Sequence, residues 1–325
     1  MLKKSMNINY VKGVLFMKKI LSMILALTIC IGACISLSSC GEKGADYQVG
    51  ICQLMVHESL DKATQGFIDG LTEALKAEGK TAEFDTQIAG EANLCTTVVN
   101  TFIAKNVDLI MANATPALLA AANATPTIPV LGTSVTDYAD TFSGNIPKNV
   151  TGTSDAVPFD EQAKMMIDSL KLAEGDNVGV IYCTNESNSL IQYHAVKELF
   201  EAEGIVVTAY TFSETTELQA LVGKAASECK AIYIPSDNTV AQNDTIVGTI
   251  CTQKNVPVFT SYGGAICYAS LAIDYYELGK KTGAQAAEIL LGNKKASDIE
   301  VETLTPTVVY NEELCAKLGI EVPAN

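Results

Sequence analysis

The sequence predicts an α/β protein of two lobes, each with a doubly wound parallel sheet, and a ligand cleft between them. Three observations predict this fold class. From residue 46 onward, short apolar runs alternate with amphipathic stretches joined by short loops. The same order and spacing begin again near residue 159, although the residues themselves do not repeat. The 286 residues after position 39 suit one large or two medium domains.

The first series of elements spans residues 47–132. Strands are predicted at residues 47–54, 81–88, 107–112 and 128–132, and helices at 59–78, 92–105 and 115–123. The first helix carries Leu60, Ala63, Phe67, Leu71, Ala74 and Leu75 on one stripe, and Gly79 ends it. Short connections in a βαβ series favour a parallel sheet with helices as crossovers.

The second series follows residues 144–154, which have no clear period and are interpreted as a crossing between the lobes. Helices are predicted at residues 159–170, 189–203, 214–228, 240–253 and 276–291, and strands at 178–183, 205–210, 231–235, 256–260 and 271–274. Residues 305–310 are predicted to form a closing strand.

The N-terminal segment predicts export. Met17-Lys18-Lys19 precedes an apolar run that ends in Leu37-Ser38-Ser39-Cys40, which is typical of a secretory signal peptide. The cysteine at the cleavage point resembles a lipobox, so residues 1–39 are expected to be removed and Cys40 to carry the lipid, including palmitate. The alternative is a signal peptide with an ordinary Ala-x-Ala cleavage site. Residues 1–16 look unlike a signal, and a start codon assigned too far upstream is one interpretation of them.

The charge of the mature part argues against a nucleic-acid partner. All 22 basic residues are lysines, five of them precede Cys40, and the 17 that remain face 37 carboxylates. Nucleic acids and anionic lipid headgroups both select basic surfaces. The sequence therefore predicts membrane contact through acyl chains alone. No second apolar run is long enough to span a bilayer.

Seven cysteines follow Cys40, namely Cys52, Cys95, Cys183, Cys229, Cys251, Cys267 and Cys315. An odd number leaves at least one unpaired, and a disulfide framework is not expected in a chain this large. We interpret them as buried thiols. No C-x-x-C occurs among them and the chain has two histidines, so no zinc site and no cofactor are expected.

In doubly wound sheets the ligand crevice lies at the carboxyl ends of the strands. This rule selects the loops 53–59, 113–116, 133–137, 184–189, 235–239 and 261–264. Several open helices with capping residues, and the free N–H groups of a helix start suit an anion. Because the chain has no arginine, a ligand carboxylate is expected on the Thr115 hydroxyl and on the N–H groups near 187–189.

The same loops carry carboxylates that suit an ammonium group: Glu58, Asp137, Glu186, Asp237 and Asp274. Together these features predict a zwitterion, an α-amino acid, with its ammonium on Asp237 or Asp274. Each acid taken alone is more often a helix cap or a surface charge. His57, Phe159, Tyr262 and Tyr275 could stack on a ring, since the chain has no tryptophan. Patterns for a P-loop, a Gly-x-Ser-x-Gly elbow or a dinucleotide fingerprint are absent, so no enzyme is predicted.

Ordered motifs give a resemblance to a known family. They are 53–61 (QLMVHESLD), 114–117 (ATPA), 135–137 (VTD), 149–152 (NVTG), 185–189 (NESNS), 234–239 (IPSDNT) and 273–279 (IDYYELG). In this order they resemble the ABC-transporter substrate-binding lipoproteins related to tryptophan- and tyrosine-binding proteins. The chain departs at Asp137-Tyr138, where relatives often have proline after the aspartate.

The resemblance implies a type I periplasmic-binding fold with three crossings, hinge closure on a small ligand, and delivery to an ABC permease and ATPase. Residues 40–46 would form the lipid anchor and linker, 47–153 with 275–300 one lobe, and 154–274 with 301–325 the other. We expect an extracytoplasmic, membrane-anchored monomer. A receptor subunit for a membrane signalling protein and a sugar- or nucleoside-binding lipoprotein are the alternatives. The predicted ligand-binding residues are Gln53, His57, Thr115, Asp137, Glu186, Ser187, Asn188, Ser189, Asp237, Asn238, Asp274 and Tyr275.

Overall fold

A computed structural model of the 325-residue chain describes residues 44–323. The predicted signal peptide and the lipidation at Cys40 lie outside the described residues. From Ala45 onward the chain forms one compact unit that contains two β-sheets. None of the helices in residues 44–323 combines the length and the hydropathy that a membrane span requires.

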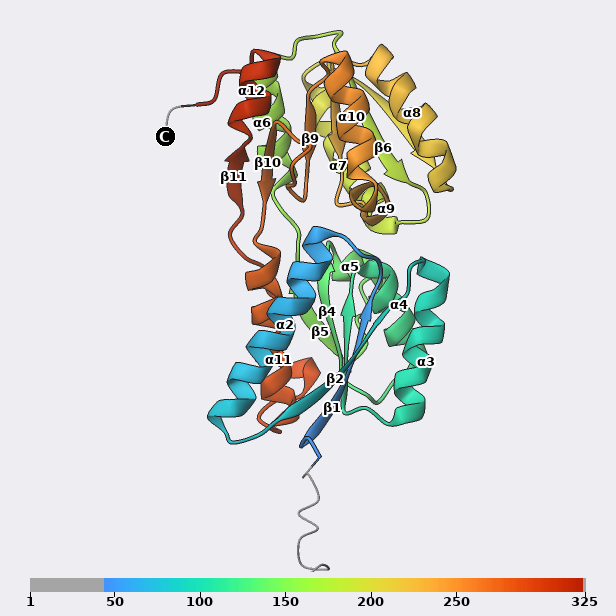
Figure 1. Ribbon diagram of the computed structural model, residues 1–325, viewed down its shortest axis with the longest axis vertical. Coiled ribbons are helices and arrows are strands. Elements are labelled where there is room, and N and C mark those ends of the chain that lie inside the picture. The colour runs from blue at the N-terminus through green and yellow to red at the C-terminus, as the bar shows by residue number, and fades with distance from the viewer. Residues whose placement is uncertain (1–43, 324–325) are drawn as a thin grey trace, which may run out of the picture. The chain divides into compact units, whose positions relative to one another are not determined.

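The first sheet has five parallel strands in the order β2-β1-β3-β4-β5. The strands are β1 (Tyr47–Gln53), β2 (Ala82–Ile88), β3 (Leu109–Asn113), β4 (Val130–Val135) and β5 (Val150–Ser154). The helices between them are α2 (Glu58–Ala77), α3 (Cys95–Lys105), α4 (Thr115–Ala124) and α5 (Tyr138–Thr141), with the short η1 (Ala92–Leu94) before α3 (Figure 1). The order reverses between β1 and β3, which is where a doubly wound sheet opens its crevice.

The second sheet has six strands in the order β11-β10-β9-β8-β6-β7. They are β6 (Asn177–Cys183), β7 (Val206–Phe212), β8 (Ala231–Ile234), β9 (Val258–Thr260), β10 (Ala269–Ala272) and β11 (Thr307–Tyr310). Only β11 runs antiparallel to its neighbour. The surrounding helices are α6 (Phe159–Leu170), α7 (Ser187–Ala202), α8 (Thr215–Glu228), α9 (Asn238–Gln242), α10 (Asp244–Lys254) and α12 (Glu312–Leu318).

The two sheets, parallel except for the edge strand β11, confirm the predicted fold class of two doubly wound α/β lobes. The chain does not divide into two consecutive halves. After β10 it enters α11 (Tyr275–Leu290), which packs along α2 beside the first sheet, and after η2 (Ala296–Asp298) it adds β11 to the second sheet (Figure 1). Residues 155–158, 273–274 and 299–306 therefore connect the two sheets.

Four glycines allow α2 and α11 to pack with their backbones in contact. A Cβ added to Gly66 would lie 2.0 Å from the Tyr276 carbonyl oxygen, and one added to Gly279 would lie 2.0 Å from the Ala63 oxygen. Gly70 and Gly283, one turn further along each helix, meet the opposite backbone in the same way. Any side chain at these positions would push the helices apart, so α11 is joined to the first lobe by close backbone contact.

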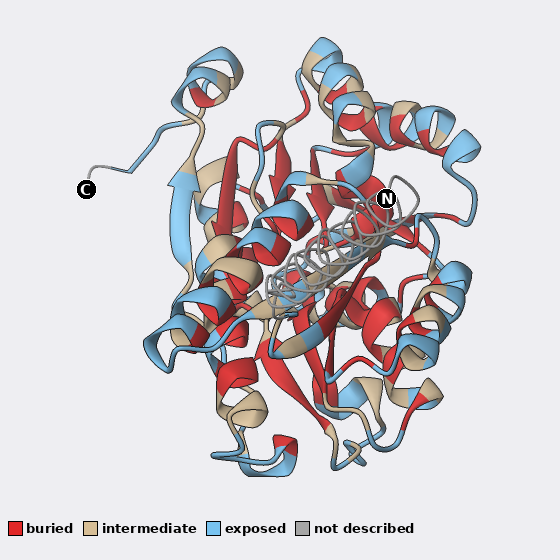
Figure 2. Ribbon diagram, turned by 60° about the horizontal axis from the view of Figure 1, so that its bottom comes forward, coloured by how far each residue is buried: buried red, intermediate tan, exposed pale blue. Residues whose placement is uncertain are grey.

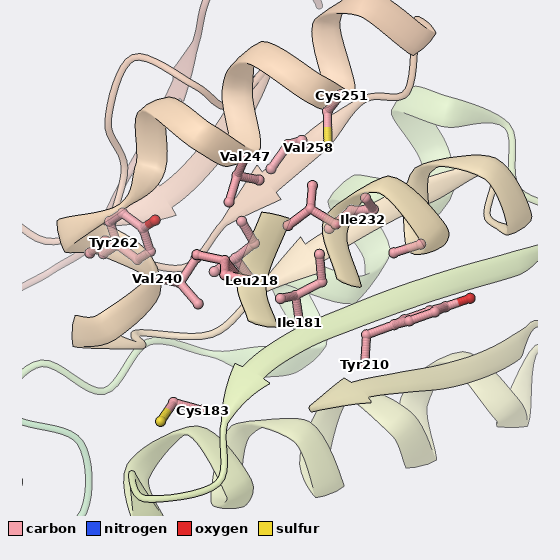
Figure 3. Packing of buried hydrophobic residues seen from close by; sticks show 14 of the residues in the cluster. Ile181, Cys183, Tyr210, Leu218, Ile232, Val240, Val247, Cys251, Val258 and Tyr262 are labelled. Atoms are coloured by element: carbon pink, nitrogen blue, oxygen red, sulfur yellow. The ribbon is translucent and has the colours of Figure 1, made fainter. Parts of the chain in front are cut away.

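The central strands of each sheet are buried, while the edge strand β11 and the outer helix faces are exposed (Figure 2). The predicted stripe on α2 is buried apart from Ala74, which is half-buried. Figure 3 shows one core of the second lobe, where Ile181 and Ile232 from the sheet meet Leu218, Val247 and Cys251 from the helices. All seven cysteines after Cys40 are buried free thiols, as the sequence predicts.

Three predictions about elements need correction. Residues 150–154, which were interpreted as part of a crossing between the lobes, form β5 at the edge of the first sheet. Its threonines are buried but hydrogen-bonded: Thr153 Oγ1 lies 2.8 Å from Thr282 Oγ1, and Thr151 donates to the Ile299 carbonyl at 2.7 Å. The helix predicted at 240–253 is two helices, because the Asn243 side chain donates to the Thr239 carbonyl and the backbone bends there. α12 was not predicted.

Candidate functional site

The site is built where the carboxyl ends of both sheets approach one another. In the first lobe, Gln53 ends β1 and lies in register with Asn113 at the end of β3. Gln53 donates to Asp61 at 2.6 Å and accepts from Thr64 at 2.6 Å. Asn113 donates to the Leu60 carbonyl at 2.8 Å. These two buried amides fix the start of α2 against the sheet, so the predicted ligand residue Gln53 already has partners within its own lobe.

In the second lobe, Glu186 is buried and accepts four hydrogen bonds. Asn238 donates its backbone N–H at 2.9 Å and its amide at 2.6 Å, and Thr239 donates its N–H at 2.8 Å and its hydroxyl at 2.7 Å. Glu186 is the N-cap of α7, so its carboxylate joins the starts of α7 and α9.

Asp237 is also buried and fully engaged. It accepts from the Cys183 N–H at 2.7 Å, the Ser189 hydroxyl at 2.8 Å and the Val240 N–H at 2.9 Å. Burial, with the nearby charge of Glu186, raises the pKa of Asp237 well above its ordinary value. These hydrogen bonds join β6, α7 and α9. The Asp237 carboxylate therefore stabilises the fold at the switch point between β6 and β8.

Two of the hydrogen-bonded links between the lobes lie at these loops. His57, the N-cap residue of α2, lies 3.1 Å from Asn238 Oδ1. Because the Asn238 amide nitrogen donates to Glu186, its oxygen faces His57, and the His57 Nε2–H is the donor. Burial lowers the pKa of His57. In the second link, Gln192 of α7 donates to the Thr136 hydroxyl at 3.2 Å and accepts from the Ser236 N–H at 2.9 Å.

The other predicted residues lie around this junction. Asn188 donates to the Ser236 carbonyl at 2.7 Å, and Ser187 is exposed at the start of α7. Thr115 is the buried first residue of α4. Asp137 and Asp274 each cap a helix: Asp137 accepts from the Asp140 N–H, and Asp274 accepts from the N–H groups of Tyr276 and Glu277. No result tests whether any of the twelve predicted residues contacts a ligand, so their ligand-binding roles stay predictions.

A further residue, Asp155, was missed from the sequence. It follows β5 in the first crossing, is 6% exposed, and accepts from the Tyr275 hydroxyl at 3.0 Å through Oδ2. Burial raises its pKa and also raises that of Tyr275. Asp155 lies directly after a strand, which is the position that marks a candidate ligand residue. Because residues 150–154 are polar, that strand was not predicted and the position was not selected. Had β5 been recognised, the strand-end rule would have selected Asp155.

The cleft contains two grooves and a small void. A groove of about 370 Å³ is lined by Ser59, Tyr262 and Tyr275 together with Asp244 and Asp274. A second groove of about 570 Å³ lies beside Leu54, Asn93 and Glu186. A void of about 10 Å³ is lined by Ser134, Asp155 and Tyr262, and it shares His57, Ser59, Ala241, Tyr262 and Tyr275 with the first groove. Within residues 44–323 no group of three His, Cys, Asp or Glu side chains could hold a metal ion.

Comparison with known proteins identifies the family. Residues 48–325 match the profile of the ABC transporter substrate binding proteins. The chain belongs to this family. A tyrosine-binding protein of Clostridioides difficile (strain R20291) is 33% identical over 283 residues, which cover 84% of this chain and 81% of that protein.

Two solved structures extend the likeness. The first is an ABC domain in complex with L-Trp from Streptococcus pneumonia, with a TM-score of 0.77, 29% identity, and coverage of 85% of this chain and 96% of that one. The second is a ligand-free, open structure of a substrate binding protein with adhesive properties from Clostridium difficile, with a TM-score of 0.64, 32% identity, and coverage of 86% and 97%.

The two-lobed architecture is that of the type I periplasmic-binding proteins. The family consists of the substrate-binding components of ABC transporters, which are not themselves enzymes. The chain is therefore an ABC transporter substrate-binding protein for a small ligand, related to proteins that bind tryptophan and tyrosine.

Proposed function

We propose that this protein is the receptor of an ABC importer for an amino acid, of the aromatic class, which it captures by closing its two lobes. The observation that carries the proposal is the junction of the lobes, where the buried carboxylate of Asp155 and the rings of Tyr262 and Tyr275 lie beside a groove of about 370 Å³. This volume is within the range of pockets that bury small ligands, about 300–1,000 Å³. The relatives named for tyrosine and solved with L-Trp support the aromatic class.

The proposed lobes are residues 47–153 with 275–300, and 154–274 with 301–325. Hinge motion would take place in the connections between the two sheets. The higher TM-score to the L-Trp complex, 0.77, than to the open ligand-free structure, 0.64, at similar identity, supports a closing arrangement of this kind.

The proposal includes an extracytoplasmic location and a lipid anchor. Substrate-binding proteins of ABC transporters are extracytoplasmic. The lipobox-like residues 37–40 support acylation of Cys40, residues 40–46 would act as a linker, and the protein would work as a monomer beside its permease and ATPase. A signalling-receptor subunit and a sugar or nucleoside binder remain the alternatives from the sequence.

The test is a thermal-shift screen of the purified mature domain against the amino acids, common sugars and nucleosides. A ligand at about 100 times its dissociation constant stabilises the folded state by about 2.7 kcal/mol. We expect the shift with tryptophan, tyrosine or another amino acid. A shift with sugars or nucleosides alone would contradict the proposal.

A further inference from the structure

Three polar side chains around the small void at the lobe junction have atoms without a partner. They are Asp155 Oδ1, Ser134 Oγ and the Tyr262 hydroxyl, each buried and without a hydrogen bond among the described residues. Buried polar atoms are paired in the great majority of cases, so three unpaired atoms around one void require an explanation. All three residues line the same void of about 10 Å³.

The backbone presents Ser134 to this void through a local distortion of β4. The register between β4 and β5 shifts between Gly132 and Val135, and Ser134 has a φ of 54° in the left-handed region. Such a conformation is strained for a non-glycine residue, and irregularities of a strand beside binding sites re-aim side chains. The strained backbone conformation therefore occurs at the residue whose hydroxyl has no hydrogen-bond partner at the void.

Tyr262 reaches the void from the second lobe. Its ring lies beside Val240 at the margin of the second-lobe core (Figure 3), while Asp155 is held from the other side by Tyr275. The lining of the void therefore includes a carboxylate and two hydroxyls from different elements. None of the ion pairs found within residues 44–323 includes Asp155, so no lysine in this region compensates its charge.

We propose that Asp155, Ser134 and Tyr262 form the ammonium-binding site of this protein, and that the ligand must therefore carry a primary amine. An ammonium group has three N–H donors, and the carboxylate oxygen and two hydroxyl oxygens provide one acceptor for each. Its positive charge also compensates Asp155, which a neutral sugar hydroxyl would leave unpaired. This inference rests on the proposed amino-acid function. It prefers Asp155 to Asp237, both of whose oxygens already accept hydrogen bonds, and to Asp274, which is exposed and caps α11 through Oδ1.

The volumes of the void and of the adjoining groove indicate where the rest of the ligand would lie. A void of about 10 Å³ has room for one small headgroup, since a single water needs about 10–15 Å³. The ligand carbon skeleton must then extend into the adjoining groove of about 370 Å³, which shares His57, Tyr262 and Tyr275 with the void. These three rings, together with Tyr276, supply the aromatic surface of that groove.

The experiment is calorimetric titration of L-tryptophan and L-tyrosine, each compared with its desamino acid, into the mature domain. In the parent protein the desamino acid should bind at least about 100-fold more weakly, because a buried carboxylate is left without its partner. Asp155→Asn should weaken binding of the amino acid by about 100-fold and leave the desamino acid unchanged or improved. Ser134→Gly and Tyr262→Phe should each cost about tenfold, because each removes one hydrogen bond to a charged group.

The matched control is Asp140→Asn, an exposed aspartate on α5, which should leave both affinities unchanged. Thermal unfolding of each variant confirms that it is folded. If the parent and Asp155→Asn bind the amino acid equally, or prefer it over the desamino acid by the same factor, the site assignment is wrong while the proposed function stands. If the parent binds neither these two nor any other amino acid, the proposed function itself fails.

Discussion

At the scale of single residues, the acids of the cleft divide by what their oxygens already contact. Glu186 and Asp237 accept backbone and side-chain donors on every side, whereas Asp155 keeps one buried oxygen unpaired. The sequence identified the first two because capping residues cluster after apolar strands. It could not separate a cap from a ligand contact, since that depends on which donors the fold brings to each oxygen.

Asp155→Asn is expected to stabilise the ligand-free protein at neutral pH, by about 0.5–2 kcal/mol, while it weakens ligand binding. Burial raises the pKa of Asp155 above the 3.8 of an unfolded chain, so between these two values the native state binds more protons than the unfolded state. Stability from this group is therefore present at low pH and is lost as pH rises through the raised pKa. The Asn variant has no such loss.

Urea unfolding of the parent and the variant as a function of pH measures this difference. The Tyr275 and Tyr138 hydroxyls that face Asp155 have raised pKa values and stay neutral in this range, so the difference reports Asp155 alone. The two curves should converge in acid, below about pH 3.8. A parent that is more stable than the variant at neutral pH would mean that the carboxylate has a compensating partner.

Glu186→Ala is expected to lower the free energy of unfolding by about 3 kcal/mol or more, because four buried donors on Asn238 and Thr239 lose their acceptor. The matched change is Asp137→Ala, which removes one N-cap hydrogen bond and should cost about 0.5–2 kcal/mol. Urea midpoints at constant m-value give both numbers. If both variants lose the same free energy of unfolding and only Glu186→Ala loses ligand binding, the result would favour the ligand-binding role that the sequence predicts for Glu186.

At the scale of elements, periodicity located the strands that are apolar and the helices with a continuous stripe. It failed at β5, where Thr151 and Thr153 are buried because their hydroxyls pair with Ile299 and Thr282, more than a hundred residues away. A strand whose interior is polar and paired at long range has no hydropathy signal of its own. It also failed at Asn243, where one side-chain hydrogen bond ends α9 before α10 begins.

Gly66→Ala and Gly279→Ala are expected to destabilise the protein by about 1–3 kcal/mol or more, because each methyl group would meet a carbonyl oxygen of the opposite helix at 2.0 Å. The control is Gly223→Ala in α8, where an added Cβ meets nothing within 4 Å. There alanine should stabilise by up to about 1 kcal/mol through helix propensity. Thermal unfolding of the three variants measures the contrast, and equal effects would show that α2 and α11 can separate without cost.

At the scale of the whole molecule, the amino-acid pattern predicted two α/β lobes because each lobe repeats the same alternation of elements. The chain returns to the first lobe through α11 because the glycines of α11 and α2 allow these two helices, far apart in sequence, to pack closely. The periodicity of residues 276–291 predicts a helix, but it does not predict which sheet this helix covers. One crossing was interpreted from the lack of a period in residues 144–154, and the number of three crossings came from the family resemblance.

Attachment to the membrane is predicted to depend on one side chain. Cys40→Ala should abolish incorporation of labelled palmitate and release the protein from the membrane fraction, because the acidic mature domain has no basic surface to hold it on anionic lipid. Metabolic labelling and cell fractionation provide the measurement, with the buried Cys315→Ala as the control. Palmitate that is still incorporated in Cys40→Ala would place the modification elsewhere.

Lobe closure is expected to be driven by the ligand and assisted by the hydrogen bonds between the lobes. Without an amine, Asp155 is a buried charge with an unpaired oxygen, so the closed arrangement is penalised until the ligand compensates it. Gln192 joins Thr136 of one lobe to Ser236 of the other, and a hydrogen bond of this kind contributes about 0.5–1.5 kcal/mol. Gln192→Ala should therefore weaken ligand binding by about three- to tenfold by reducing the closed population.

Small-angle scattering with and without saturating amino acid tests both parts of this prediction. The radius of gyration of the parent should fall on binding, and Gln192→Ala should need more ligand to reach the same value. Gln65→Ala is the control, because Gln65 is exposed on α2 and contacts Asp69 of its own helix. A scattering profile that does not change when calorimetry shows the parent to be saturated would mean that the lobes are already in their binding arrangement. In that case the Gln192 hydrogen bonds would contribute to stability and not to a closing equilibrium.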